Sequence, residues 1–338
     1  MALRFIDGFD HYAIPAQMPL KYTTVSNASI STMVGRRAGS VAVKLYNSGG
    51  DRFAISLDDQ TTWIVGFAFC PEINSTNTAK TVQFVDATSS VQLTLCLTNG
   101  VIQLYRGDGS VLLTTAAQTL QAGVWNYIEV KAVIADTNGT FEVRVNEQVW
   151  ATYTGDTKYS SSLATARTIR FGCASWVGTG FHDLYICDGT GNTNNDYLGD
   201  CRIDTLYPDG QGSNAAFTPV GSTANWENVD ETPADADTSY NTSDVVGDVD
   251  TFSFDDLGTN GNVIHGAQIN LMARKDDAGP RILRAIALND GTIHEGSNIS
   301  LSDSYLIYRH IWEQNPSAAT SWTETDINAA EFGYKVQA

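Results

Sequence analysis

The chain has 338 residues, with 20 Lys and Arg against 38 Asp and Glu, which gives a formal net charge of −18. Contacts with nucleic-acid phosphates and with anionic lipid depend on Lys and Arg, so this balance argues against both kinds of partner. The length suits two domains, and an aromatic content of 10% favours strands over helices. No segment approaches the roughly 18 apolar residues that cross a bilayer, and the N-terminus lacks the apolar core of a signal peptide. We therefore expect neither nucleic-acid binding nor membrane insertion.

Residues 1–200 contain many short segments in which apolar and polar side chains alternate. This period of two is typical of strands that bury one face. The clearest examples are residues 52–57, 61–69, 81–86, 90–97, 101–107, 125–134, 140–147 and 168–173. Asx-Gly pairs, which tolerate the positive φ of a tight hairpin, stand between them at Asn99-Gly100, Asp108-Gly109, Asn138-Gly139 and Asp188-Gly189. Strands repeated at about ten-residue spacing predict a two-sheet sandwich.

The composition changes after residue 200. Residues 203–273 contain no Lys or Arg, and residues 201–239 carry Pro208, Pro219 and Pro233 among Gly, Ser, Asn and Asp. Such a composition predicts a connector with little regular structure. The strand pattern returns in residues 240–338, at 250–257, 263–275, 281–288, 304–312 and 331–338. We expect a second, smaller β-sandwich there.

Three runs of the first domain share the pattern of one known fold. They are residues 123–134, which open with Gly-Val-Trp, the hairpin of residues 137–155, and residues 167–189, which include His-Asp-Leu-Tyr-Ile. Together they resemble the concanavalin A-like or laminin-G-like jelly roll. Two positions depart from that pattern, because Glu147 stands where Gly is usual and His182 where Asp is usual. The resemblance implies an all-β chain, with a jelly-roll sandwich in residues 1–200.

Four further motifs extend a resemblance over nearly the whole chain. They are F-x-x-G-F-D-x-Y at residues 5–12, N-N-D-x-L-G-D-x-R at 194–202, A-R-K-x-D-A-G at 273–279, and W-T-x-x-D-I-N-A-x-E-F-G at 322–333. Combined with the jelly roll, this set is similar to a group of bacteriophage structural proteins. The resemblance implies a component of the virion, with head decoration, head fibre and tail fibre all open. We expect a homo-oligomer on the particle surface whose partners are other virion proteins of the capsid or tail.

The sequence lacks the common catalytic patterns. A retaining glycoside hydrolase needs two carboxylates about 5–5.5 Å apart, and no strand carries the spaced Glu and Asp residues that would supply them. A Gly-x-Ser-x-Gly nucleophile turn, a phosphate-binding loop and a His-Glu-x-x-His pair are also missing. We therefore predict a protein that is not an enzyme. Two alternatives stay open, a receptor-binding adhesin for host-surface carbohydrate and a capsule-degrading glycosidase.

Two kinds of ligand site can be proposed from the residues. The candidate glycan contacts are the loop aromatics Trp176 and Tyr159, with His182 and Asp183 beside them on the closing strand. The candidate ligands for Ca²⁺, which takes 6–8 oxygen atoms, are Asn194, Asp196 and Asp200. Asx residues are also common in turns that bind nothing, because their side chains bond to the nearby backbone.

The N-terminal segment and the cysteines complete the candidates. Phe5, Phe9 and Tyr12 are interleaved with polar residues and suit an anchoring or exchanged arm, with an ordinary first strand as the alternative. The cysteines are odd in number and match no zinc spacing, so we expect reduced, structural thiols. They are Cys70, Cys96, Cys173, Cys187 and Cys201.

Overall fold

The computed structural model describes residues 2–26, 30–46, 52–73, 75–160, 163–173, 178–258 and 261–338. It divides into two compact units. Unit 1 comprises Met1–Asp10 and Ile14–Ile203, and unit 2 comprises His11–Ala13 and Asp204–Ala338. The helical elements are short: α1 (Met18–Lys21), the 3₁₀ turn η1 (Trp226–Asn228) and α2 (Glu324–Ala329). In the described ranges, no helix is long and apolar enough to cross a bilayer.

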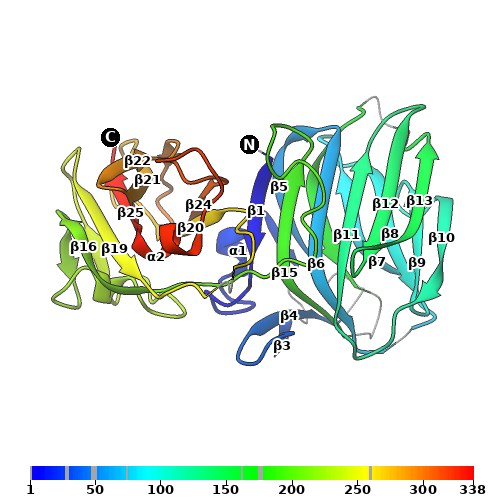
Figure 1. The fold of residues 1–338 in the computed structure, drawn as a ribbon, viewed down its shortest axis with the longest axis horizontal. Coiled ribbons are helices and arrows are strands. Elements are labelled where there is room, and N and C mark those ends of the chain that lie inside the picture. The colour runs from blue at the N-terminus through cyan, green and yellow to red at the C-terminus, as the bar shows by residue number, and fades with distance from the viewer. Residues whose placement is uncertain are drawn as a thin grey trace. The chain divides into compact units, whose positions relative to one another are not determined.

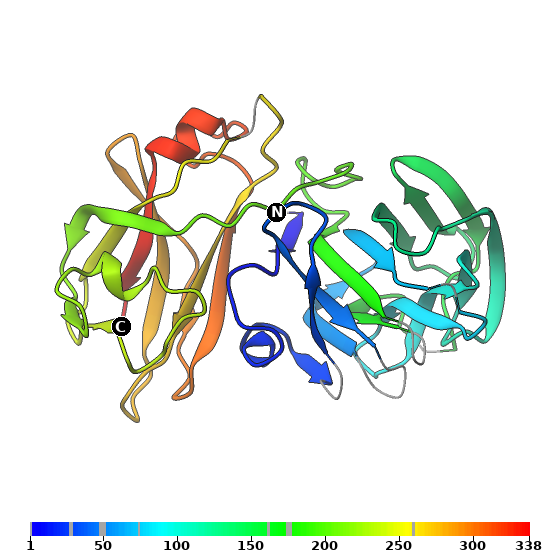
Figure 2. The same ribbon diagram turned by 90° about the horizontal axis from the view of Figure 1, so that it is seen from below.

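Unit 1 is built from two antiparallel sheets (Figures 1 and 2). Sheet A has the spatial order β13 (Gln148–Gly155), β12 (Gly139–Val145), β11 (Asn126–Val133), β6 (Thr62–Pro71), β15 (Thr179–Asp188), β4 (Val41–Leu45) and β3 (Ser31–Val34), and β1 (Leu3–Asp7) also pairs with β15. Sheet B has the order β10 (Val111–Thr119), β9 (Val101–Arg106), β8 (Val91–Thr98), β7 (Ala79–Val85), β14 (Ala166–Gly172), β5 (Arg52–Gln60) and β2 (Thr24–Ser26). This architecture confirms the predicted jelly-roll sandwich.

Aromatic side chains from the inner faces hold the two sheets together. Phe53 of sheet B lies edge-on to Phe181 of sheet A, with ring centroids 5.6 Å apart. Phe67 of sheet A and Phe171 of sheet B lie 5.8 Å apart. All four rings are fully buried. Burial of one Phe side chain stabilises a fold by about 1.5–3 kcal/mol. The alternation in the sequence places these side chains on the inner faces of both sheets, and their burial stabilises the packing of the two sheets against each other.

The predicted hairpin turns differ from one another in the structure. Asn99-Gly100 joins β8 to β9 with φ of 52° and 78°, as an Asx-Gly turn requires. Gly139 instead begins strand β12. A Cβ there would lie 1.8 Å from Thr157 Oγ1 and 2.7 Å from the Val133 carbonyl oxygen. Gly139 is therefore required for close packing and not for a left-handed turn.

The N-terminal segment is not an arm, which corrects one of the two expectations. Residues Leu3–Asp7 form β1, whose partner is β15. Phe5 and Phe9 are fully buried, and Tyr12 is 5% exposed. Phe9 lies 6.0 Å from Phe53 in the core of unit 1. The alternation of apolar residues that suggested an arm is the ordinary period of a strand with one buried face.

Residues 201–239 are not the loose connector that their composition suggested. They contain β16 (Pro208–Ala215), β17 (Thr218–Val220) and η1, and most of them belong to unit 2. The carboxylate of Asp250 is fully buried and accepts hydrogen bonds from Phe217 N (3.0 Å) and Asn225 Nδ2 (2.6 Å). Asp250, on a strand distant in sequence, therefore satisfies a backbone N–H and a side-chain amide of this segment, and composition alone does not reveal such a partner.

Unit 2 is a smaller sandwich, as predicted. Its main sheet, sheet C, has the order β16, β19 (Val249–Phe254), β25 (Glu331–Val336), β21 (Ile282–Asn289) and β22 (Thr292–Glu295), and β23 (Ile299–Ser300) also pairs with β21. Two further antiparallel pairs are β17 with β18 (Tyr240–Thr242) and β20 (Ala267–Ala273) with β24 (Leu306–Trp312). Trp312 of β24 lies 6.0 Å from Phe332 of β25 within one apolar core.

All five cysteines are free thiols, and four of them are buried. Burial raises the pKa of Cys96 to about 12 and that of Cys201 to about 12. Free, protonated thiols in apolar surroundings behave as small hydrophobic side chains.

Candidate functional site

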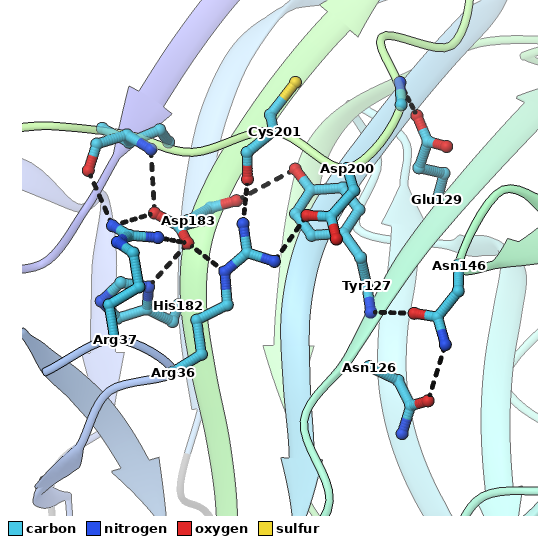
Figure 3. A network of polar contacts seen from close by, with 12 residues as sticks. Arg36, Arg37, Asn126, Tyr127, Glu129, Asn146, His182, Asp183, Asp200 and Cys201 are labelled. Carbon is cyan, nitrogen blue, oxygen red and sulfur yellow. Dashed lines mark hydrogen bonds and ion pairs between the residues drawn. The ribbon is translucent and has the colours of Figure 1, made fainter. Parts of the chain in front are cut away.

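The most connected polar group of unit 1 is the carboxylate of Asp183, on β15. It is fully buried at a bulge where β15 loses register with β6, and its own φ is 46°. Oδ2 accepts Arg36 Nε at 2.6 Å, and Oδ1 accepts Arg37 Nη2 at 2.9 Å and the Ile203 backbone N–H at 2.9 Å. Figure 3 shows both arginines directed at this carboxylate. Charge-assisted bonds of this kind are about twice as strong as neutral ones.

The surroundings of Asp183 fix it in the ionised form. Burial on its own would raise the pKa of Asp183, but the hydrogen bonds from His182 and Arg37 and the charge of Arg36 outweigh it, so the pKa lies well below its usual range. Burial would likewise lower the pKa of Arg36, but Asp183 and Asp200 raise it. The cluster is a charge-compensated tie in which the Asp183 carboxylate is ionised and Arg36 is charged at neutral pH.

The tie fastens the last segment of unit 1 to sheet A. Arg36 donates to the Asp200 carboxylate and to the Cys201 carbonyl oxygen as well as to Asp183 (Figure 3). Arg37 donates to the Ile203 carbonyl oxygen at 3.2 Å. The two arginines thus bridge the turn after β3 to residues 200–203, the end of unit 1.

Residues 197–199, just before the tie, lie on the outer face of sheet A. Glu129 Oε1 accepts the Tyr185 hydroxyl at 2.5 Å and the Gly199 N–H at 2.9 Å. The Leu198 N–H donates to the Tyr185 hydroxyl at 3.2 Å. The Arg144 guanidinium lies 3.8 Å from the centre of the Tyr197 ring. Glu129, Tyr185 and Arg144 on the outer face of sheet A therefore contact residues 197–199 of the same chain.

A glycine makes room for this arrangement. Gly66 of β6 lies next to Tyr185 of β15 in the register of sheet A. A Cβ at Gly66 would come within 2.0 Å of the Tyr185 ring. Only Gly at this position lets the ring lie flat enough for its hydroxyl to reach Glu129.

The structure does not assemble the predicted Ca²⁺ site. Asp196 pairs with Lys131 Nζ at 2.9 Å, whereas Asp200 pairs with Arg36. Asn194 has a φ of 56°, a conformation common for Asn in turns. Within the described ranges, no group of three or more His, Cys, Asp or Glu side chains could hold a metal ion. The acidic residues of this motif balance nearby basic side chains instead.

The predicted glycan contacts are also not brought together. His182 and Asp183 are fully buried and belong to the tie. Tyr159 lies elsewhere, with its N–H donating to Gln92 Oε1 at 2.8 Å and its ring lying where a side chain at Gly107 would be. Trp176 lies outside the described residues. Neither His182 nor Asp183 can reach a ligand on the surface without the core opening.

A second polar cluster, which the sequence analysis missed, lies on the outer side of sheet B, where Gln83 and Thr94 are buried. Arg170 of β14, Gln83 of β7, Thr94 of β8 and Tyr105 of β9 face one another across four adjacent strands. We call these four residues the sheet B row. Arg170, Gln83 and Thr94 each stand between two buried apolar residues, so part of the signal was present in the period of two. Only the strand order brings the four residues into line.

Comparisons with known proteins give no family. No family model matches the chain, and no curated protein matches it. Among solved structures, it is similar to the cellulose induced protein Cip1, with 16% identity over 54% of this chain and 89% of that one and a TM-score of 0.36. Domain 4 of AbnA, a GH43 extracellular arabinanase from Geobacillus stearothermophilus solved with arabinotriose, gives 14% identity, 48% and 77% coverage, and a TM-score of 0.35. A sialidase gives 12% identity and a TM-score of 0.36, and the match spans only 16% of its length. At these identities and TM-scores the similarities carry no conclusion about function.

Proposed function

We propose that this protein is a non-enzymatic structural component of a bacteriophage virion, exposed on the particle surface as head decoration, head fibre or tail fibre. It docks onto capsid or tail proteins as a homo-oligomer. The motifs that resemble phage structural proteins support the proposal, since they supply framework residues of unit 1, such as Phe5, Phe9 and Asp200. Because these motif residues stabilise the fold of unit 1 and do not form a reactive centre, they suit a protein with a role in particle assembly.

The observation that carries the proposal is an uncharged side of unit 1. The edge strands β10 and β13 lie next to each other where the two sheets end (Figure 1). Neither strand contains a charged residue, in a chain with a net charge of −18. Exposed aliphatic side chains occur on both, with Leu112 and Val149 each 50% exposed. An uncharged surface lowers the local repulsion between two acidic molecules that meet there, and exposed apolar side chains favour such a contact.

The length of these edges strengthens the argument. β10 has nine residues and β13 has eight, whereas the opposite edges of the two sheets, β2 and β3, have three and four. Proteins normally prevent edge strands from pairing with other chains by placing charges or proline on them, or by keeping them short. An edge pair left this long and uncharged suits contact with another protein.

The outer face of sheet A, which residues 197–199 cover at Glu129, favours a structural role over an enzymatic one. Glu129, the buried carboxylate on that face, is engaged by Tyr185 and Gly199. A carboxylate that serves in glycoside hydrolysis must reach the scissile bond. A purified protein that releases no reducing ends from host capsule would support this reading, and release of reducing ends would establish the glycosidase alternative.

Mass spectrometry of purified particles tests the proposal. Particles from the bacterium that carries the gene are banded by density and washed, and the chain is quantified relative to the major capsid protein. A fixed stoichiometry supports the proposal, with many copies favouring the head and few favouring the tail. Absence of the chain from washed particles contradicts it.

A further inference from the structure

A lysine and an aspartate of unit 1 form an ion pair inside the core. Nζ of Lys21, at the end of α1, lies 3.3 Å from Oδ1 of Asp7, at the end of β1, and both side chains are 0% exposed. By contrast, Nζ of Lys44 and Oε1 of Glu72 lie 2.6 Å apart with side chains 22% and 35% exposed. Removing two charges from water is costly, so a buried ion pair is weak evidence for a purely stabilising role.

Aromatic side chains lie around this pair. Nζ of Lys21 is 5.2 Å from the centre of the Phe5 ring. The centroid of the Tyr22 ring is 5.4 Å from that of Phe5 and 5.1 Å from that of Phe53, and both phenylalanines are fully buried. Such an apolar environment disfavours the charged forms of an amine and a carboxyl group. Transfer of a proton from Lys21 to Asp7 therefore costs less here than in water.

Hydrogen bonds fix the orientation of both reacting groups. The Phe9 N–H donates to Oδ1 of Asp7 at 2.8 Å, and the Tyr22 hydroxyl donates to Oδ2 at 2.7 Å. Nζ of Lys21 donates to the Ile6 carbonyl oxygen at 3.5 Å. A donor 2.7–3.1 Å from an oxygen atom stabilises negative charge that develops on that atom during a reaction. The Tyr22 hydroxyl stands at this distance from Oδ2.

We propose that Lys21 and Asp7 condense into an amide bond between their side chains, an isopeptide, in the folded chain. A proton passes from Nζ to Oδ1, and the lone pair of the neutral amine then attacks Cγ of Asp7. The electron pair of the C=O bond moves to Oδ2, where the Tyr22 hydroxyl stabilises the charge. Nζ gives a second proton to the Oδ1 hydroxyl, the Cγ–Oδ1 bond breaks, and the C=O bond forms again. One ammonium and one carboxylate thus become one neutral amide and one water molecule, without any other reactant.

The product suits the same surroundings better than the ion pair does. The amide carries no charge, so the cost of burying two charges disappears. Its oxygen, Oδ2, still accepts from Tyr22, and its N–H still has the Ile6 carbonyl oxygen beside it. Because the fold holds both groups in one place, the reaction is effectively unimolecular. The bond closes residues 8–20 into a loop and joins β1 to α1, so the two elements stay linked when the chain unfolds.

This inference goes beyond the structural role proposed above and does not depend on it. It assigns a covalent modification that the chain makes by itself. Because the test uses purified protein and no particles, its failure leaves the particle assignment untouched, and the converse also holds.

Peptide mapping by mass spectrometry tests the inference. The full chain is expressed in a bacterium, incubated in the folded state, denatured and digested with trypsin, which cuts after Arg4, Lys21 and Arg36. Trypsin needs a free ammonium group, so it does not cut at a condensed Lys21. We expect residues 5–36 as one peptide that is lighter than its sequence mass by one water. A further cut with chymotrypsin after Phe9 opens the loop, and the two pieces should remain joined through Asp7.

Two variants and an internal control sharpen the test. Lys21→Arg keeps the positive charge but replaces the amine, so trypsin should cut at residue 21 and no water should be lost. Tyr22→Phe removes the donor to Oδ2 and should slow the condensation by at least about tenfold, measured as the condensed fraction against time after a pulse of synthesis. Lys44, in its exposed pair with Glu72, should be cut normally in every sample. Circular dichroism shows that each variant is folded.

Several outcomes would overturn the inference. One is a folded, aged chain that gives residues 5–21 and 22–36 as separate peptides of full mass. Another is a missed cut at Lys21 without loss of water, which shows protection from trypsin and no bond. A loss of water that persists in Lys21→Arg, or that maps to an Asp-Gly pair such as Asp108-Gly109, would assign the loss to a succinimide instead. Condensation of Tyr22→Phe at the native rate would remove the hydroxyl from the mechanism.

Discussion

The Asp183 tie provides the sharpest stability prediction. Replacing Asp183 by Asn keeps the shape of the side chain and removes the charge that Arg36 and Arg37 share. Arg36 keeps Asp200, but Arg37 loses its carboxylate partner in a partly buried position. Removing one partner of a buried ion pair costs about 3–5 kcal/mol, because the remaining charge is uncompensated. We expect Asp183→Asn to lower the free energy of unfolding of unit 1 by about 3 kcal/mol at neutral pH.

Urea unfolding of the full chain, followed by circular dichroism, measures this difference. With a slope of about 3 kcal/mol per molar urea, the midpoint of the unit 1 transition should fall by about 1 M. Asp59→Asn removes one partner of the exposed Asp59–Arg167 pair and serves as the control, because a solvent-exposed ion pair contributes little to stability. A loss in Asp183→Asn no larger than in this control would refute the reasoning.

The pH dependence gives an independent check on the same residue. The pKa of Asp183 is lowered in the folded protein, so its contribution to stability is fully present above the unfolded pKa of about 3.9. It is lost as the pH falls below that value and through the lower folded pKa. The difference between native protein and Asp183→Asn should be constant near neutrality and shrink in acid. A difference that grows in acid would contradict this assignment.

Three further changes have expected outcomes. Gly66→Ala forces a methyl group against the Tyr185 ring and should cost about 1–3 kcal/mol, visible as a lower melting temperature, while an unchanged melting temperature would show that the ring can move. Glu147 has a φ of 66° in the turn between β12 and β13, so Glu147→Gly should stabilise unit 1 by about 0.5–1 kcal/mol, and a destabilised variant would disprove strain there. Since the pKa values of Cys96 and Cys201 are raised to about 12, both thiols should resist a thiol reagent at mildly alkaline pH and react fully in denaturant, and rapid labelling of either residue in the folded protein would contradict the raised pKa values.

The fold was largely predictable because its strands show the simplest pattern. The alternation in residues 52–57 and 168–173 follows from one buried and one exposed face, and both segments became strands of sheet B. β16, with the sequence Pro-Asp-Gly-Gln-Gly-Ser-Asn-Ala, has no apolar alternation and was predicted to be a connector. It is a strand because β19 supplies its backbone partners, which lie far away in sequence.

The candidate site shows the same limit. The sequence singled out His182 and Asp183, but their role depends on Arg36, which lies 147 residues from Asp183 in the sequence. A buried carboxylate and an exposed one have the same letter in the sequence, and only the fold decides between a ligand contact and an internal tie. The sheet B row was missed for a related reason, since its members come from four separate strands.

The most direct test of the account is imaging of intact particles that carry a label on the C-terminus of this chain. The account predicts label on the particle surface, distributed over the head for a decoration protein or head fibre, or gathered at one pole for a tail fibre. Particles without label, from a lysate in which the labelled chain is present and folded, would contradict it.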